Sequence, residues 1–189
     1  NPQLDITEIR QRKMVCPSTT GGINWNSIAY SPQTNALYAP TNNVCMDYYL
    51  NPVNPTVGGY HSSAVSRKIS VPEGDEQIGI FSAVDVSSGE TLWSYKQRAA
   101  ITGSVLTTGG GLAFVTDDAR RLRAFDVNNG RILWEQILNS SAGGFPTTYS
   151  VDGTQYIAIA AGGGVSHRAL TPEIQQRRGG NTLFVFRLP

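Results

Sequence analysis

The chain has 189 residues, of which 40% are hydrophobic and only 15% are charged, so it can bury one substantial core and is not disordered through excess charge. Fifteen basic and fourteen acidic residues leave a formal net charge of +1, which does not favour a broad basic surface for nucleic acid. No run of about 18 apolar residues is present, so the sequence predicts no membrane span.

Turn-forming residues are frequent in this sequence. It contains 20 Gly and 10 Pro, together with many Ser, Thr and Asn. Glycine supplies positive φ, proline fixes φ, and short polar side chains bond to nearby backbone at turns. Good helix formers never occur in a sustained amphipathic run, and the one weak helical window, Pro172–Arg178, is short and polar. The sequence therefore predicts an all-β fold with many tight turns.

The two cysteines, Cys16 and Cys45, come early in the chain. Neither belongs to a C-x-x-C pair, and only His61 and His167 could complete a metal site, so the residues do not favour zinc. Two buried free thiols and a disulfide are both compatible with the sequence, since a disulfide depends on an oxidising compartment. The residues alone leave these two alternatives open.

A repeated pattern, A-x-D-x-x-x-G-x-x-x-W, occupies the middle of the chain and occurs twice, 41 positions apart. The first copy consists of Ala83, Asp85, Gly89 and Trp93, and the second of Ala124, Asp126, Gly130 and Trp134. A worn copy begins at Ala29 and ends near Tyr38, where the aromatic residue falls one place early. Repeats of about 40–45 residues with one hairpin signature each are typical of propeller blades.

Each position of the repeat has a structural task. The Asp and the polar pair after it predict a tight hairpin turn, in which Gly takes the left-handed conformation. The next strand carries a Trp whose large face can be buried between neighbouring blades. The eight residues are therefore expected to be structural docking residues, and Asp85 and Asp126 are expected to take no part in catalysis.

Alternating segments separated by turn residues predict further strands after the first copy. They are Ser104–Thr108, Leu112–Thr116, Arg121–Asp126, Arg131–Gln136, Thr147–Ser150, Gln155–Ala161 and Asn181–Leu188. About eleven strand candidates in the whole chain correspond to roughly three four-stranded blades. Residues 50–76 and 166–180 are expected to form irregular loops, with the alternative that Leu50–Glu76 hides a degenerate blade.

Three to four blades are too few to close a propeller of the usual size. An open arc would expose the apolar faces of its end blades, which is unfavourable for a soluble domain. Residues 1–189 are therefore expected to be the C-terminal portion of one longer propeller domain, or to associate with the missing part.

Several blocks of the sequence resemble one known family. The most specific is Gly21–Asn26, which reads Gly-Gly-Ile-Asn-Trp-Asn and lies between the two cysteines. The others are Cys16-Pro17, Ala29–Pro32, Asn43–Asp47, Pro146–Tyr149, Asp152–Ala158 and Gly180–Phe186, together with the two Trp repeats. On these blocks the chain resembles the C-terminal portion of the pyrroloquinoline quinone (PQQ)-dependent alcohol dehydrogenases, the methanol and ethanol dehydrogenase group.

The resemblance implies a fold, a location and a reaction. Members of the family are periplasmic eight-bladed propellers that hold PQQ near the propeller axis beside a calcium or lanthanide ion. They oxidise alcohols to aldehydes by hydride transfer to the quinone. The partners implied for this chain are the missing N-terminal blades, the alcohol substrate and an electron acceptor such as a cytochrome c. The final strand, Thr182–Arg187, would pair with an N-terminal segment and close the ring.

The resemblance also assigns roles to individual residues. It implies that Asn24 hydrogen-bonds PQQ and that Gly164 and Val165 lie in a loop brought up to the cofactor. It further implies that Cys16 and Cys45 are joined in a disulfide.

The sequence departs from the family at two positions near the implied site. Members often carry Trp where this chain has Thr102 and Ser166, so the usual aromatic walls are not expected here. If the block around Asn24 is a strand, its neighbour Trp25 points to the opposite face, away from the cofactor.

The catalytic Asp and the metal ligands of the family come from earlier blades, so this chain is expected to supply neither and to be inactive alone. Asp117 and Asp118 could mimic a carboxylate pair, but adjacent residues at a strand end face apart, so a solvated turn is expected. The alternative function is a propeller scaffold for protein interaction without a cofactor. A scaffold would need neither Asn24 nor the cysteine pair.

Overall fold

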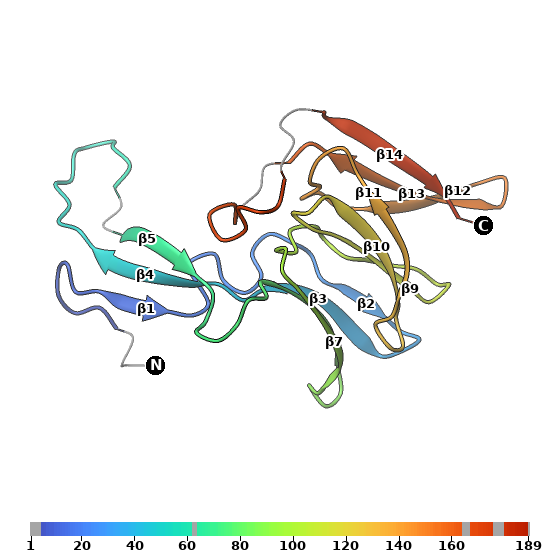
Figure 1. Ribbon diagram of the computed structural model, residues 1–189, viewed down its shortest axis with the longest axis horizontal. Helices are drawn as coiled ribbons and strands as arrows, with labels where there is room; N and C mark the ends of the chain where they lie inside the picture. The colour runs from blue at the N-terminus through green and yellow to red at the C-terminus, as the bar shows by residue number, and fades with distance from the viewer. Residues whose placement is uncertain (1–4, 62–63, 164–166, 176–179, 189) are drawn as a thin grey trace.

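The computed structural model of the chain describes residues 5–61, 64–163, 167–175 and 180–188. Every regular element in these ranges is a β-strand, and the strands form four antiparallel sheets (Figure 1). Among the described residues no helix is long or apolar enough to cross a bilayer. The all-β prediction is confirmed.

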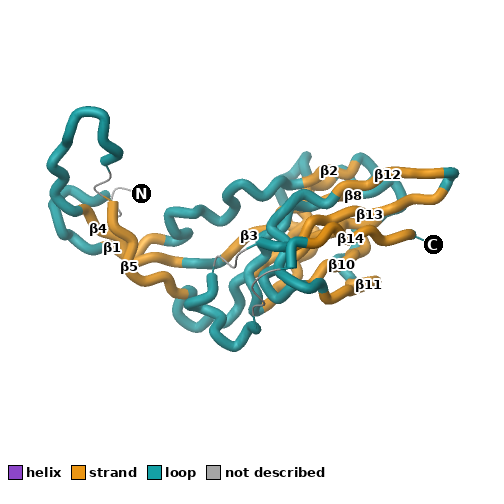
Figure 2. The backbone as a smooth tube through the Cα atoms, turned by 90° about the horizontal axis from the view of Figure 1, so that it is seen from above, coloured by secondary structure: helices purple, strands orange, loops and turns teal. Residues whose placement is uncertain are grey.

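Three of the sheets are propeller blades stacked face to face in an open arc (Figures 1 and 2). The first blade contains β2 (Ala29–Ser31), β3 (Ala36–Asn42), β6 (Gly79–Asp85) and β7 (Thr91–Gln97) in that order. The second contains β8 (Leu106–Thr107), β9 (Leu112–Thr116), β10 (Arg121–Asp126) and β11 (Ile132–Ile137). The third contains β12 (Thr147–Val151), β13 (Thr154–Ala161) and β14 (Thr182–Arg187). The strands expected after residue 104 are all present, with ends that differ by a few residues.

The fourth sheet is a side sheet that stands apart from the blades (Figure 2). It contains β1 (Lys13–Val15), β4 (Cys45–Leu50) and β5 (Ala64–Ser70), and β4 and β5 are inserted between two paired strands of the first blade, β3 and β6. Residues 50–76 are therefore not wholly irregular, because β5 pairs with β4. They do not hide a blade either, since β4 pairs on its other edge with the short N-terminal strand β1. The described residues 167–175 contain turns and no strand.

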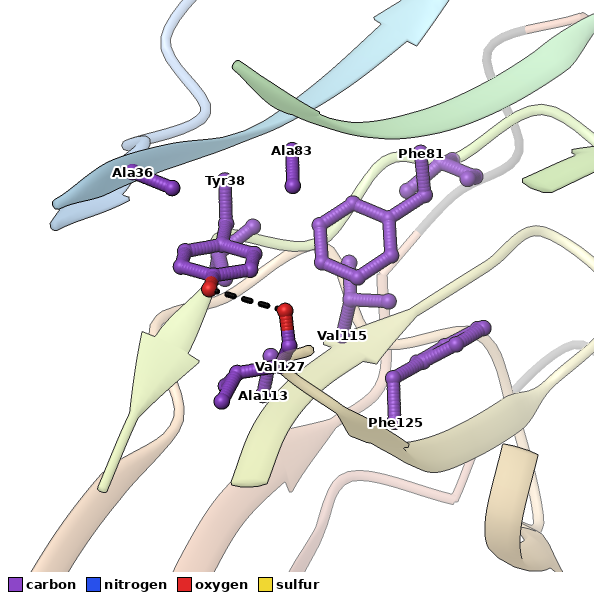
Figure 3. Close-up of a cluster of buried hydrophobic side chains, with 10 residues drawn as sticks. Ala36, Tyr38, Phe81, Ala83, Ala113, Val115, Phe125 and Val127 are labelled. Atoms are coloured by element: carbon purple, nitrogen blue, oxygen red, sulfur yellow. Dashed lines mark hydrogen bonds between the residues drawn. The ribbon is translucent and has the colours of Figure 1, made fainter. Parts of the chain in front are cut away.

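The largest core lies between the first two blades rather than within one sheet (Figure 3). From the first blade it takes Ala36, Tyr38, Phe81 and Ala83, and from the second Ala113, Val115, Phe125 and Val127. Across the two blades the rings of Phe81 and Phe125 meet edge to face, with their centroids 5.0 Å apart. A second core joins the second and third blades through Phe114, Leu122, Ala124, Ile157 and Ile159.

Trp93 is the residue that joins the first blade to the turn of the second. Its indole Nε1 donates a 2.9 Å hydrogen bond to the carbonyl of Val127, and its ring lies 6.4 Å from that of Phe125 at an angle of 13°. Gly130, at φ +70°, lies directly under the indole, and a Cβ there would come within 2.5 Å of a ring carbon. The Tyr38 hydroxyl donates to the same Val127 carbonyl at 3.0 Å, so two aromatic side chains share one acceptor.

Trp134, the tryptophan of the second copy, makes a different contact. Its ring meets Phe186 of β14 edge to face at 5.1 Å, and the residue keeps 37% of its surface exposed. The two copies of the repeat thus have the same hairpin, but only Trp93 packs on a glycine turn within the described residues.

The Asp residues of both copies cap their hairpin turns. The Asp85 carboxylate accepts bonds from the backbone of Ser87 and Ser88, and the Asp126 carboxylate accepts one from Asn128, each at 2.8 Å. These backbone donors lower the pKa of both carboxyl groups, because they stabilise the charged form. The contacts give both residues a turn-capping task.

The worn copy is not a separate blade. It is the β2–β3 hairpin, which lies in the same sheet as the first full copy, and Tyr38 faces Ala29 across it as Trp93 faces Ala83. The pairing of β6 with β7 contains a bulge after Ala83, whereas β2 and β3 pair without one. The missing bulge residue explains why the aromatic side chain comes one place early.

Candidate functional site

The loops that precede the first strand of each blade (β2, β8 and β12) meet at one end of the blades, beside the ends of β3, β9 and β13. Residues 22–25 form a bend at this end, and Asn42 at the end of β3 donates its backbone N–H to the Gly22 carbonyl at 2.7 Å. On the other side of the bend, the Asn26 amide donates to the carbonyl of Thr102, and the Ser27 N–H donates to Ser104 Oγ at 2.9 Å. The bend is therefore held at both ends by groups from two blades.

Further bonds link this bend to the third blade. The Thr116 hydroxyl donates to the carbonyl of Ala142, and the Ser104 N–H donates to that of Gly144 at 3.1 Å. The backbone N–H groups of Gly162 and Gly163 both donate to the Ser141 carbonyl, at 3.0 and 3.1 Å. We call segments 22–27, 99–105, 141–144 and 162–163 the loop belt. It is fixed by backbone and amide bonds rather than by exposed ion pairs.

A hollow of about 610 Å³ opens beside the loop belt. Its lining residues are Trp25, Gly143, Gly144, Ala160, Ala161, Gly162, Gly163, Asn181, Thr182 and Leu183. None of them carries a charge, and six are glycine or alanine, so backbone forms much of the surface. Gly162 adopts φ +141°, and a Cβ there would come within 2.2 Å of Asn181 Oδ1, so this position requires glycine.

Asn24, the expected cofactor residue, lies exposed on the bend of the loop belt rather than in a strand. The segment is not the strand on which Trp25 was expected to point away from the cofactor, and Trp25 lines the hollow. Gly164 and Val165 lie outside the described residues, as does Ser166. They follow Gly163, which also lines the hollow.

Sequence reasoning missed Gly143 and Gly144 as lining residues. The available signal was this Gly-Gly pair itself, which lies shortly before a predicted strand, as Gly21-Gly22 lies before the first strand of the first blade. Thr102 is buried and bonded into the loop belt, where its hydroxyl donates to Asp118 Oδ1 at 2.9 Å. It therefore presents no aromatic wall to the hollow.

Asp117 and Asp118 are buried, at 1% and 0% exposure, so the expected solvated turn is wrong. Asp117 Oδ2 accepts bonds from Arg123 at 2.6 Å and from Gln97 at 3.1 Å. Burial lowers the pKa of Arg123, but the neighbouring acidic groups, Asp117 foremost, together outweigh it and raise that pKa. The two carboxylates have different partners, and the ion pair with Arg123 together with the bond from Gln97 of the first blade compensates the burial of Asp117.

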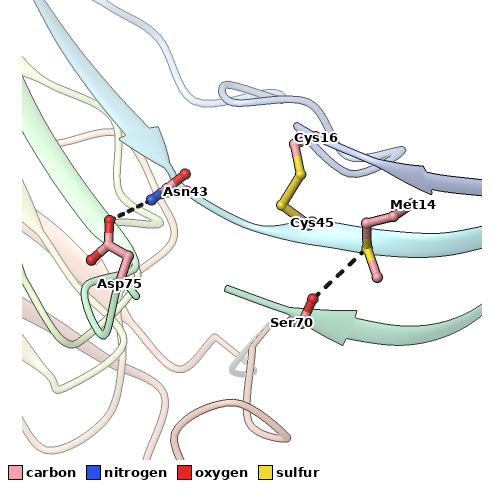
Figure 4. The surroundings of a disulfide bond; sticks show 6 residues. All are labelled: Met14, Cys16, Asn43, Cys45, Ser70 and Asp75. Carbon is pink, nitrogen blue, oxygen red and sulfur yellow. Dashed lines mark hydrogen bonds between the residues drawn. A yellow bond between two sulfur atoms is a disulfide. The ribbon is translucent and has the colours of Figure 1, made fainter. Parts of the chain in front are cut away.

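The disulfide implied by the resemblance is present. Cys16, just after β1, and Cys45, the first residue of β4, are joined with their Cα atoms 4.4 Å apart (Figure 4). Next to it, Asn43 donates to Asp75 at 2.8 Å. The bond fixes the side sheet where it joins the first blade, and neither cysteine lines the hollow.

Histidine offers little to the site. His167 is buried, and burial lowers its pKa, so the ring is neutral near pH 7. His61 lies in an exposed loop after the side-sheet strand β4. Within residues that the structure describes, no three His, Cys, Asp or Glu side chains lie together as a metal site.

Known quinoproteins share both the sequence and the architecture. Residues 83–157 match the PQQ family model, described as the β-propeller domain of glucose, ethanol and alcohol dehydrogenases. The chain is 34% identical over 182 residues to 1-butanol dehydrogenase (quinone) of Thauera butanivorans, a match that covers 93% of the chain and 28% of that protein. It is 33% identical over 156 residues to methanol dehydrogenase [cytochrome c] subunit 1 of Methylobacterium organophilum, covering 80% of the chain and 25% of the relative.

A solved structure of a quinoprotein also resembles the fold of this chain. The europium-containing methanol dehydrogenase superposes with a TM-score of 0.79 at 29% identity, covering 87% of this chain and 30% of that one. The chain thus spans between a quarter and a third of the length of the relatives that it matches. With its tryptophan-linked blades, the chain matches the PQQ-dependent (quinoprotein) alcohol dehydrogenases over most of its length and has the architecture of part of their β-propeller.

Proposed function

We propose that the chain forms one side of a PQQ site in a longer dehydrogenase that oxidises alcohols to aldehydes. The observation that carries the proposal is the display of Asn24 on a bend clamped at both ends, beside a hollow lined by glycine backbone. An exposed side chain on a fixed segment is available to a ligand at little cost in conformational entropy.

The residues fit one edge of a planar quinone. The Asn24 amide offers two donors and one acceptor, which suit the carbonyl and carboxylate groups at the edge of the ring. Gly162 and Gly163 allow close approach of backbone. The proposal assigns a cofactor contact also to Gly164 and Val165, which follow them in the sequence. When bound, PQQ supplies the acceptor for the hydride of the alcohol.

The remaining groups of the site come from other parts of the longer protein. Among the residues that the structure describes, no charged side chain lines the hollow, so the calcium or lanthanide ligands, the catalytic base and cations that balance the PQQ carboxylates are assigned to the N-terminal blades. A cytochrome c or similar protein is proposed as electron acceptor, as the name of the Methylobacterium relative indicates for that protein. The Cys16–Cys45 disulfide supports a periplasmic location, because disulfides persist in oxidising compartments.

The test is replacement of Asn24 in the longer protein. Asn24→Ala should weaken PQQ binding by roughly three- to tenfold, the effect of one lost hydrogen bond, as measured by equilibrium dialysis. Asn51→Ala, at the end of the side sheet, is the matched control and should bind PQQ as the wild type does. Failure of the wild-type protein to bind PQQ, with calcium or a lanthanide supplied, would overturn the proposal and favour the scaffold alternative.

A further inference from the structure

Asn42, the last residue of β3, links two segments of the loop belt. Its backbone N–H donates to the Gly22 carbonyl at 2.7 Å, where the bend that carries Asn24 begins. Its side-chain Nδ2 donates to the Ile101 carbonyl at 3.0 Å, and its Oδ1 accepts the Ile101 N–H at 2.9 Å. One residue therefore bonds both to the bend and to segment 99–105.

The two bonds to Ile101 take the place of a neighbouring strand. Ile101 is 2% exposed and forms a single antiparallel bridge with Asp117, beside which the Asp118 N–H donates to the carbonyl of Ala100 at 2.9 Å. The backbone groups of Ile101 itself are bonded by the Asn42 amide. A carboxamide offers a donor and an acceptor side by side, which is what the buried backbone of one strand residue needs.

Glycine at the facing position allows this contact. Gly79 is the partner of Asn42 in the pairing of β3 with β6. A Cβ at Gly79 would come within 2.2 Å of the Ala99 carbonyl oxygen and within 2.8 Å of the Ile101 side chain. Residues 99–101 therefore lie directly against the start of β6, within reach of the Asn42 amide.

The bonds of Asn42 hold both ends of the bend. Its backbone fixes Gly22, and its amide fixes the segment that carries Thr102, whose carbonyl accepts the Asn26 amide. Asn24 lies midway between the two anchored positions, Gly22 and Asn26. Loss of the Asn42 amide would leave the first anchor in place and release the second.

We propose that Asn42 is a positioning residue for the cofactor site, which holds the bend so that Asn24 meets PQQ in one fixed orientation. This inference rests on the proposed function, since Asn42 acts through Asn24. The neighbouring Asn43 has a different task, because its side chain donates to Asp75 at 2.8 Å beside the side sheet (Figure 4). A ligand group that is already held in place binds at a smaller cost in conformational entropy.

The test is a double-mutant cycle of PQQ affinity in the longer protein, measured by equilibrium dialysis with calcium or a lanthanide supplied. Asn42→Ala should weaken PQQ binding by about three- to tenfold, as Asn24→Ala does, because Asn24 is no longer held in place. In the Asn24→Ala background, Asn42→Ala should change the affinity by less than about twofold, because the residue through which it acts is gone. Asn43→Ala is the matched control and should bind PQQ as the wild type does.

A second measurement needs no variant. Because PQQ binding and anchoring of the bend support each other, PQQ should slow amide exchange in a peptide that spans residues 99–105. A peptide that spans residues 84–90, at the opposite end of the first blade, should exchange at an unchanged rate. Hydrogen exchange read by mass spectrometry on the wild-type protein gives this comparison, so it stands even where Asn42→Ala fails to fold.

The outcomes separate the two proposals. Losses that multiply in the double variant, an Asn42→Ala protein that behaves as Asn43→Ala does, or exchange of residues 99–105 that PQQ leaves unchanged would each overturn the inference and leave the proposed function standing. Wild-type protein that binds no PQQ contradicts the proposed function itself. Faster exchange of residues 22–27 in Asn42→Ala than in Asn43→Ala would then still support Asn42 as the residue that holds the bend.

Discussion

At the scale of single residues, Gly130 combines two constraints that are usually found apart. It holds a left-handed backbone conformation at the hairpin turn, and it leaves room for the indole of Trp93 from the neighbouring blade. Gly89 occupies the same position in the first copy at φ +75°, but no atom lies within 4 Å of the place of its Cβ. Comparison of Gly130 with Gly89 therefore separates the free-energy cost of strain in the turn from the cost of losing the contact with Trp93.

We predict that Gly130→Ala destabilises the protein by about 2–4 kcal/mol, whereas Gly89→Ala costs only about 1 kcal/mol. Both substitutions force alanine into the left-handed region, but only the first pushes Trp93 away from Phe125 and the Val127 carbonyl. Urea unfolding of both variants, monitored by tryptophan fluorescence, measures the difference. Equal losses of stability would show that the docking of Trp93 contributes nothing.

At the scale of elements, the side sheet depends on few contacts. Within the described part of the chain strand β1 pairs only with β4, over Lys13–Val15, and the disulfide follows directly after this short ladder. A strand of three residues does not hold itself in place, so the covalent bond keeps it on the sheet. The side sheet and the blades should therefore differ in how they respond to loss of the disulfide.

We predict that Cys16→Ser combined with Cys45→Ser releases β1 and leaves the blades intact. Closing a loop of this length stabilises by about 3–4 kcal/mol, so amide exchange at Lys13–Val15 should accelerate on the order of a hundredfold. Hydrogen exchange of the longer protein measures this, with Leu112–Thr116 of β9 as the internal reference. Unchanged exchange in β1 would contradict the prediction.

At the scale of the whole molecule, the arc ends in an apolar face. Side chains on the side of the third blade that points away from the second blade include Tyr149, Val151, Leu183 and Val185, each at least 42% exposed in this chain. A face of this kind on a sheet marks a surface that another structure covers. In the proposed longer protein, that structure is the next blade of the ring.

We predict that Leu183→Lys combined with Val185→Lys destabilises the longer protein by at least about 2 kcal/mol, although both positions are exposed in this chain. The reason is that the two ammonium groups would be buried against the next blade. Val86→Lys, at an exposed turn position in the first blade, is the control and should change stability by less than about 0.5 kcal/mol. Thermal unfolding compares them, and the absence of any difference would mean that nothing covers this face.

The blades could be predicted from the sequence because their signals are local. The spacing from Ala83 to Trp93 and from Ala124 to Trp134 reports one hairpin each, and turn residues mark the strands between them. The side sheet was missed because β4 pairs with β1, far away in the chain, and no local pattern reports such pairing. Burial of Asp117 was missed for the same reason, since its partner Gln97 belongs to another blade.

The candidate site was predictable only in part. The Gly-Gly-Ile-Asn-Trp-Asn block indicated Asn24 through its resemblance to a family, whereas the strand considered for this block is a bend. The bend is produced by bonds from Asn42 and Thr102, which lie 20 or more positions from Gly22. Long-range bonds of this kind leave no periodic signal in the sequence.

The insertion in the first blade has a practical consequence. Strands β3 and β6 pair without a break up to the partners Asn42 and Gly79, so the excursion of residues 43–78 starts and finishes at adjacent points of one ladder. Its length is therefore free to vary without disturbing the register of the blade. This position therefore suits protein engineering. A tight turn could replace residues 43–78, or a foreign domain could be inserted there, without changing the pairing of β3 with β6.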